Sequence, residues 1–354
     1  MILRQILPLA VAACWVASFC VASLGVPIVG AAPAGADPVA DFYKGKTVAL
    51  VVGHEVGSGY DVYGRVLARH LSRHIPGHPT IVVQNMVGAA GMIASNWLYN
   101  IAPRDGSVVA TFSASPIAEP ILGNPAARYE PAKFTWIGNM DESAGTCGVT
   151  KASGIGKFDD LLVRETIFGA TAQTGTFGKF ALAVKNLLGA KYRIVSGYKG
   201  SADVKIALGR GEVHGICGLP LSTITSHWRD DYESGNFRPI IQLSGTRHPD
   251  LKSVPHVDYY AKSPEDLQVY GLIFGMQALG RFYVSPPAVP IDRRDALRSA
   301  LAAAMNDPQF RADAAKTQID INPSGGAEVE TFIARVAASS PAVIERSKRA
   351  LRPD

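Results

Sequence analysis

The stretch KTVALVVGHEVGSGYDVYGRVLARHLSRH, residues 46–74, decides the fold class of this chain. It begins with an apolar run of β type at 47–52 and continues through a glycine-rich loop at 53–59. Apolar residues then recur at helical spacing from Val62 to Leu71. A strand, a glycine loop and a helix N-terminus in this order expose backbone N–H groups beside the positive end of the helix dipole. The stretch therefore predicts an α/β unit with a seat for an anion.

Two sets of alternating strand and helix patterns follow one another along the chain. The first set has such patterns at 47–52, 60–74, 80–85, 92–100, 107–112 and 134–140. The second set starts near Cys147 and has them at 158–164, 166–171, 177–188, 192–198, 201–209, 213–218, 221–232 and 238–244. This alternation predicts a parallel sheet flanked by helices, followed by a second α/β domain with its own sheet.

The segment after the second set indicates how the two domains are connected. The apolar, glycine-broken run at 270–286 is expected to carry the chain back into the first domain, which helices at 292–306 and 326–338 would complete. We therefore predict two α/β lobes, the second inserted into the first. Lobe 1 comprises 37–144 and 266–354, and lobe 2 comprises 145–265. A cleft between the lobes is the expected ligand site, and Asp141-Glu142 near the crossing is expected to be a solvated hinge.

The N-terminus has the features of an export signal. Arg4 precedes an apolar stretch at 6–29, and Ala34-Gly35-Ala36 forms an Ala-x-Ala site. Residues 1–36 are therefore predicted to be a signal peptide, cleaved near Ala36, and the mature protein is expected to be exported. The alternative is an uncleaved anchor, against which Pro8 and Pro27 argue. The net charge of +5 comes from scattered Lys and Arg, which does not favour nucleic-acid binding.

The cysteines and histidines allow several interpretations. Cys14 and Cys20 would leave with the signal, so Cys147 and Cys217 remain as either one disulfide or two buried thiols. Neither lies in a Cys-x-x-Cys motif, and no zinc site is expected. His70 and His74 stand at i, i+4, but no Glu follows His70, so we expect a packed or surface-edge pair and no metal.

Loops rich in Gly, Ser, Thr and Asn follow most of the predicted strands, at the end where open α/β sheets bind ligands. They lie at 53–61, 85–91, 113–115, 171–176, 198–201 and 218–222, and Ser113 is a candidate ligand residue. Backbone N–H groups and small hydroxyls in such loops would hold a small anion without a side-chain cation. His54 and Glu55 in the first loop are possible specificity residues, or else a solvated loop pair.

Motifs for catalysis and for nucleotide binding are incomplete. Gly57-Ser58-Gly59 does not meet the Gly-x-Ser-x-Gly spacing of a nucleophile elbow. Val62 stands where a dinucleotide-binding motif needs its third glycine, and the sequence contains no P-loop motif. We therefore expect a protein that is not an enzyme and has no cofactor.

Several of these motifs together resemble one family. FYKGKTVALVVG, GSGYD, IVVQNMVGAAG, PRDG, GYKGS and GRGEVHGICG resemble, in this order, the Bug-type periplasmic solute-binding proteins of tripartite tricarboxylate transporters. The resemblance spans about Asp41 to the C-terminus. It implies a two-lobe Venus-flytrap fold, type II-like, that binds a small carboxylate as a monomer and delivers it to an integral-membrane permease.

The resemblance also implies particular ligand residues. They are Gly57, Ser58, Gly59 and Asp61 in the first loop, Thr171, Thr174 and Thr176 after a lobe-two strand, and Tyr198, Ser201 and Asp203 at the GYKGS turn. The first loop departs from the family, since Gly53-His54-Glu55-Val56 replaces a Pro-Gly-Gly type opening. Two alternative functions remain: a carboxylate-sensing partner of a signalling receptor, or an exported hydrolase.

Overall fold

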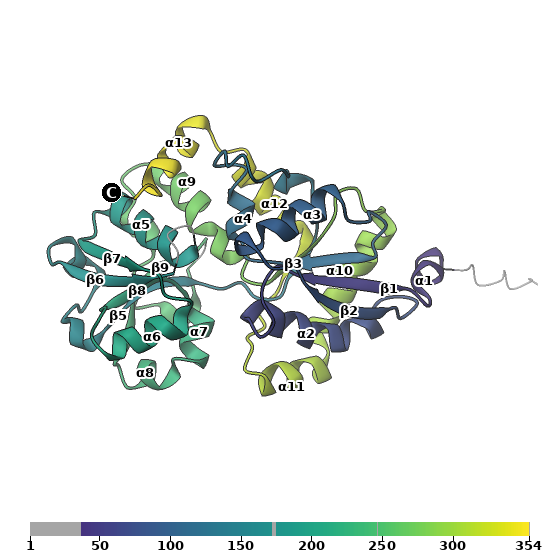
Figure 1. Cartoon of the computed structure of the whole chain (residues 1–354), viewed down its shortest axis with the longest axis horizontal. Coiled ribbons are helices and arrows are strands. Elements are labelled where there is room, and N and C mark those ends of the chain that lie inside the picture. The colour runs from purple at the N-terminus through teal and green to yellow at the C-terminus, as the bar shows by residue number, and fades with distance from the viewer. Residues whose placement is uncertain (1–36, 172–174, 246, 354) are drawn as a thin grey trace, which may run out of the picture. The chain divides into compact units, whose positions relative to one another are not determined.

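The first α/β unit is built on the strand predicted at 47–52. In the computed structural model, which describes residues 37–171, 175–245 and 247–353, that strand lies inside a six-stranded sheet with the order β11-β4-β10-β3-β1-β2 (Figure 1). Its strands are β1 (Thr47–Val52), β2 (Thr80–Asn85), β3 (Val108–Thr111), β4 (Thr135–Asn139), β10 (Phe282–Ser285) and β11 (Ser324–Gly325).

The first sheet, which was predicted to be parallel, is only partly so. β1 pairs in parallel with β2 and β3, but β10 runs antiparallel between β3 and β4, and β11 is antiparallel to β4. The reason is the direction from which the chain returns. The parallel strands end at the cavity described below, and β10 begins there, directly after Arg281, so it must run the opposite way.

Helices cover both faces of the first sheet. Val48 and Leu50 of β1 belong to the apolar cluster formed with α2, α10 and α11, whereas Val51 belongs to the cluster that includes α3 and α12. This alternation follows from the two-residue period of a strand. The helices of this unit are α1 (Pro38–Tyr43), α2 (Gly59–Leu71), α3 (Met92–Asn100), α4 (Ser115–Ala118), α10 (Ile291–Asn306), α11 (Pro308–Lys316) and α12 (Gly326–Ala337).

The second sheet has five strands in the order β7-β6-β8-β5-β9. β6 is parallel to β7 and β8, and β5 is antiparallel to β8 and β9, because β5 enters from the cavity end. The strands are β5 (Gly145–Thr150), β6 (Thr166–Ala170), β7 (Tyr192–Ser196), β8 (Gly215–Pro220) and β9 (Phe237–Leu243). All of them come from within 145–265, whereas the strands of the first sheet lie outside that range; the exact lobe boundaries stay a prediction.

Helices of the second unit also lie on two faces. Figure 1 shows α6, α7 and α8 on one face of the second sheet and α5, α9 and α13 on the other. The helix predicted at 221–232 is broken into two, and α13, which the sequence patterns did not predict, packs against α5 and α9. The helices are α5 (Thr176–Leu188), α6 (Ser201–Gly209), α7 (Leu221–Ser226), α8 (Arg229–Glu233), α9 (Pro264–Ile273) and α13 (Pro341–Ala350).

A disulfide joins two central strands of the second sheet. Cys147 of β5 and Cys217 of β8 are register partners, both are fully buried, and their sulfurs are bonded. Of the two states that the sequence left open, the structure therefore has the disulfide. A native cross-link of this kind typically contributes about 2–5 kcal/mol to stability.

The predicted signal peptide, residues 1–36, lies outside the described residues. Across 37–353, apart from the gaps at 172–174 and 246, no helix has both the length and the apolar character needed to cross a bilayer.

Candidate ligand-binding site

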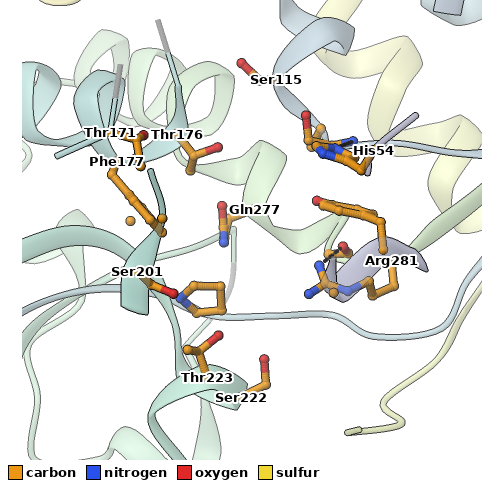
Figure 2. A pocket seen from close by; sticks show the side chains of 18 of the residues that line it. His54, Ser115, Thr171, Thr176, Phe177, Ser201, Ser222, Thr223, Gln277 and Arg281 are labelled. Carbon is orange, nitrogen blue, oxygen red and sulfur yellow. Dashed lines mark hydrogen bonds between the residues drawn. The ribbon is translucent and has the colours of Figure 1, made fainter. Parts of the chain in front are cut away.

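A cavity of about 940 Å³ lies where the strands of both sheets end. Its walls come from the loops after β1, β3, β6 and β7, from the end of β8, from the first turns of α5, α6 and α7, and from the segment between η8 (Gly275–Ala278) and β10. This volume lies within the range of pockets that bind small organic molecules. Figure 2 shows Thr171, Thr176 and Ser201 on one side of the cavity and His54 and Arg281 on the other.

The second-lobe wall contains two helix N-termini without side-chain caps. Thr176 and Ser201 are the first residues of α5 and α6, and both line the cavity. The preceding N-cap residues are Gly175 and Gly200, so among the described residues no N-cap side chain accepts a hydrogen bond from either helix. The first N–H groups of a helix have no partner within the helix, and the helix dipole places partial positive charge beside them. This wall is therefore suited to binding an anionic oxygen.

Gly218 allows the start of α5 to approach β8 closely. Its φ is +79°, and a Cβ atom there would lie 3.2 Å from the carbonyl oxygen of Thr176. A side chain would thus be strained by its backbone conformation and would crowd the first residue of α5.

The first-lobe wall is built on the glycine loop, whose conformation is fixed by hydrogen bonds to nearby side chains. Oδ2 of Asp61 accepts hydrogen bonds from the Gly57 N–H (2.8 Å) and from Arg65 Nε (2.9 Å), and Oδ1 accepts one from Asn85 Nδ2 (2.9 Å). Ser58 Oγ in turn accepts the N–H of Asp61. Burial alone would raise the pKa of Asp61, but these hydrogen bonds outweigh it, and the pKa lies below its ordinary value.

His54 lies in this wall as an uncharged ring. Its Nε2 accepts the N–H of Ser113 (3.2 Å), which places the ring proton on Nδ1, and the ring stacks on Tyr60 with centroids 4.4 Å apart. Burial, assisted by the nearby positive charge of Arg281, lowers the pKa of His54 to about 4. The ring therefore acts as a neutral polar surface at neutral pH. Its neighbour Glu55 is exposed and does not line the cavity.

Arg281 places a cation in the same wall. Its guanidinium lies over the rings of Tyr60 (4.4 Å) and Tyr63 (4.7 Å), and its Nη1 donates to the carbonyl of Gly280 (2.6 Å). Its Nε is buried and has no hydrogen-bond partner among the described residues. A side-chain cation therefore lines this cavity beside the loops, and whether an anion is held without it stays a prediction.

Seven of the residues that the sequence indicated line the cavity together. They are His54, Gly57, Gly59, Ser113, Thr171, Thr176 and Ser201. Four predicted ligand residues, Ser58, Asp61, Tyr198 and Asp203, do not line it, and Thr174 lies outside the described residues. Asp203 accepts the N–H of Lys199 (3.1 Å), and Tyr198 packs on the apolar cluster beside β6.

Sequence reasoning missed several other lining residues, among them Phe177, Thr223, Gln277 and Arg281. Gln277 and Arg281 belong to the glycine-broken segment that was expected to connect the lobes. Because this segment returns past the predicted cleft, its polar side chains could have been predicted to line the cavity.

Asp141 corrects the prediction of a solvated hinge. It is 3% exposed, and its Oδ2 has no hydrogen-bond partner among the described residues. Burial raises its pKa to about 7, although Arg281 opposes the shift. A Cβ atom at Gly280 would lie 2.6 Å from the carbonyl oxygen of Asp141, so the two crossing segments pack tightly here.

The histidine pair of α2 contacts carboxylates of α11. His70 Nε2 lies 2.9 Å from Asp313 Oδ2, and His74 Nε2 lies 2.9 Å from Asp307 Oδ2. In the described part of the chain, no group of three or more His, Cys, Asp or Glu residues is arranged to hold a metal ion. The pair therefore joins two helices of the first lobe.

Comparisons with known proteins support the fold. No family model matches the chain. It is 23% identical over 330 residues to the "UPF0065 protein in gbd 5'region" of Cupriavidus necator, covering 90% of this chain and 92% of the relative. A TctC solute binding protein from Polaromonas superposes with a TM-score of 0.65 at 18% identity, covering 86% of this chain and 99% of that one.

A third similar protein is R. palustris Rpa4515, solved with adipate, with a TM-score of 0.60 and 21% identity. The match covers 86% of this chain and 97% of that one. These similarities confirm the resemblance and the predicted two-lobe periplasmic-binding-protein fold, in which the second lobe is inserted into the first.

Proposed function

We propose that this protein is an exported solute-binding receptor that captures a small organic acid in the cavity between the two sheets. The observation that carries the proposal is the pair of uncapped helix N-termini, α5 and α6, which face the same cavity as Arg281. Each of these features favours an anion. One similar protein is a TctC solute binding protein and another is described with adipate, and this supports a carboxylate as the ligand class.

The charge of the cavity supports the same ligand class. Among the described residues, four cationic side chains line the cavity: Lys179, Lys199, Lys205 and Arg281. Of the described residues that line it, Asp320 is the acidic one. Burial raises the pKa of Asp320, so this carboxylate is protonated more readily than that of an ordinary aspartate. Lys179 and Lys205 are paired with Glu119 and Asp231, which leaves Lys199 and Arg281 to attract a dicarboxylate or other acid.

The finer parts of the proposal concern what happens around binding. We place the protein in the periplasm as a monomer, with residues 1–36 removed on export. Delivery of the acid to a tripartite tricarboxylate-type permease would follow closure of the lobes around the ligand, since a ligand that contacts both lobes favours the closed state. No catalytic step is proposed.

A thermal-shift screen tests the proposal. The panel is succinate, malate, adipate, citrate, hexanoate and benzoate, each compared with the corresponding amide. A ligand at 100 times its Kd stabilises the folded protein by about 2.7 kcal/mol, so at least one acid should raise Tm by several degrees while its amide does not. If no acid raises Tm, or if acids and amides act equally, the cavity is not a carboxylate site.

A further inference from the structure

We propose that Arg281 binds an anionic group of the ligand through a direct ion pair, and that this residue makes the cavity selective for negatively charged ligands. The inference rests on the proposed function and names the side chain that would bind the anionic group. It differs from the expectation drawn from the sequence, in which backbone N–H groups and small hydroxyls hold the anion without a side-chain cation.

Arg281 differs from two neighbouring cations because they already have carboxylate partners. Lys179 pairs with Glu119 and donates to Ser115 Oγ (3.1 Å), and Lys205 pairs with Asp231 (3.0 Å). Among the described residues, Arg281 has no carboxylate within ion-pair distance. The buried Asp141 is near enough for Arg281 to oppose the rise of its pKa, but it does not form an ion pair with the guanidinium. An acidic ligand would supply the direct ion pair that Arg281 lacks.

The guanidinium is held in place before any ligand arrives. Two tyrosine rings support its face, and the bond from Nη1 to Gly280 fixes one edge. Its Nη2 lies 3.1 Å from the position that a Cβ atom would take at Gly59, so the glycine leaves room for this atom beside the loop. A guanidinium oriented in this way loses little side-chain entropy on binding, which strengthens an ion pair.

An apolar part of the cavity lining indicates where the rest of the acid lies. Phe177 and Phe180 of α5 line it together with Leu272, Ile273 and Met276. Apolar side chains bind hydrocarbon and exclude water, and a drier cavity strengthens the ion pair. We therefore expect an organic acid whose charged group lies at Arg281 and whose carbon skeleton contacts the aromatic side chains of α5.

The chain offers a matched control for the test. Arg293 also lies over an aromatic ring, that of Phe42 (3.6 Å), donates through Nη1 to a backbone carbonyl, that of Asp105 (2.9 Å), and has a buried Nε without a partner among the described residues. Arg293 does not line the cavity. Arg293→Met therefore reproduces the loss of a stacked arginine without touching the proposed site.

The experiment measures the affinity of the acid that gives the largest stabilisation in the panel above, by isothermal titration calorimetry. Arg281→Met should weaken binding at least tenfold, Arg281→Lys should retain part of the affinity because it keeps the charge, and Arg293→Met should bind like the wild type. Raising NaCl from 50 to 500 mM should weaken binding to the wild type more than binding to Arg281→Met.

The outcomes separate the inference from the proposed function. If no acid of the panel binds the wild type, both fail. If an acid binds the wild type and Arg281→Met binds it with unchanged affinity and unchanged salt dependence, the proposed function stands and the role of Arg281 is overturned. Because Arg281→Lys keeps the stacked cation, affinity lost in Arg281→Met and partly retained in Arg281→Lys supports the ion pair even if Arg281→Met lowers Tm.

Discussion

The two walls of the cavity offer a ligand different kinds of polar group. In the first-lobe wall, the Asp61 carboxylate accepts the Gly57 N–H of the glycine loop, Ser58 caps α2, and Arg281 supplies the charge. In the second-lobe wall, α5 and α6 begin after N-cap glycines, which offer no capping side chain. The first wall is therefore a rigid surface with a side-chain cation, whereas the second offers backbone donors. An acid bound between them would contact both kinds of group.

The largest effect should come from removing the carboxylate that holds the first wall together. Asp61→Ala removes hydrogen bonds to Gly57, Arg65 and Asn85. Hydrogen bonds to a charged group contribute about 1.5–3 kcal/mol, so we expect a loss of that order in the free energy of unfolding, measured with urea. Binding of the acid should weaken as well, because the loop beside Arg281 loses its fixed shape.

Glu130→Ala is the matched control for Asp61→Ala. Glu130 pairs with Lys133 at i, i+3, but both side chains are about 60% exposed. Exposed pairs of this kind contribute little, so the control should change stability by less than about 0.5 kcal/mol. If the two variants lose the same stability, the loop is not held by the Asp61 network.

A smaller effect, on the pH dependence of stability, should come from His54 in the first-lobe wall. Burial, with a contribution from Arg281, lowers the pKa of His54 to about 4, below the ordinary value of 6.5. Between these values the unfolded chain binds a proton that the folded chain does not, so stability is fully present above pH 6.5 and falls as the pH drops toward 4. Between pH 7 and 5.5 this group should cost the wild type about 1 kcal/mol.

His54→Gln should remove that part of the pH dependence, because glutamine does not titrate. The measurement is urea unfolding of both proteins at pH 7 and 5.5, with His78→Gln, a change at an exposed histidine, as the control. Equal losses of stability in wild type and His54→Gln would show that His54 titrates normally and that the first wall is more open to water than the structure indicates.

Local patterns were sufficient to predict the elements that begin each lobe. β1 and α2 were predicted because a β-type run and a helical spacing are properties of neighbouring residues, and both elements are present near the expected limits. The glycine loop between them was identified for the same reason. What the loop does was harder to infer, since the partner of the Gly57 N–H is the side chain of Asp61, which sequence analysis had assigned to the ligand.

Long-range features were not predictable in the same way. The segment at 270–286 was identified as a crossing, but the antiparallel insertion of β10 depends on which end of the sheet the chain reaches. Arg281 lies more than two hundred residues after the loop that it faces, and nothing in its neighbours indicates a tyrosine platform. The buried state of Asp141 likewise depends on the packing of two crossing segments.

The most direct test of this account is a crystal structure of the protein with the acid that the screen selects. We expect density for an acid group within hydrogen-bonding distance of Arg281, and for the ligand's body between the glycine loop and the first turns of α5 and α6. Acid bound outside this cavity, or bound inside it with Arg281 turned away and only the apolar wall in contact, would contradict the account.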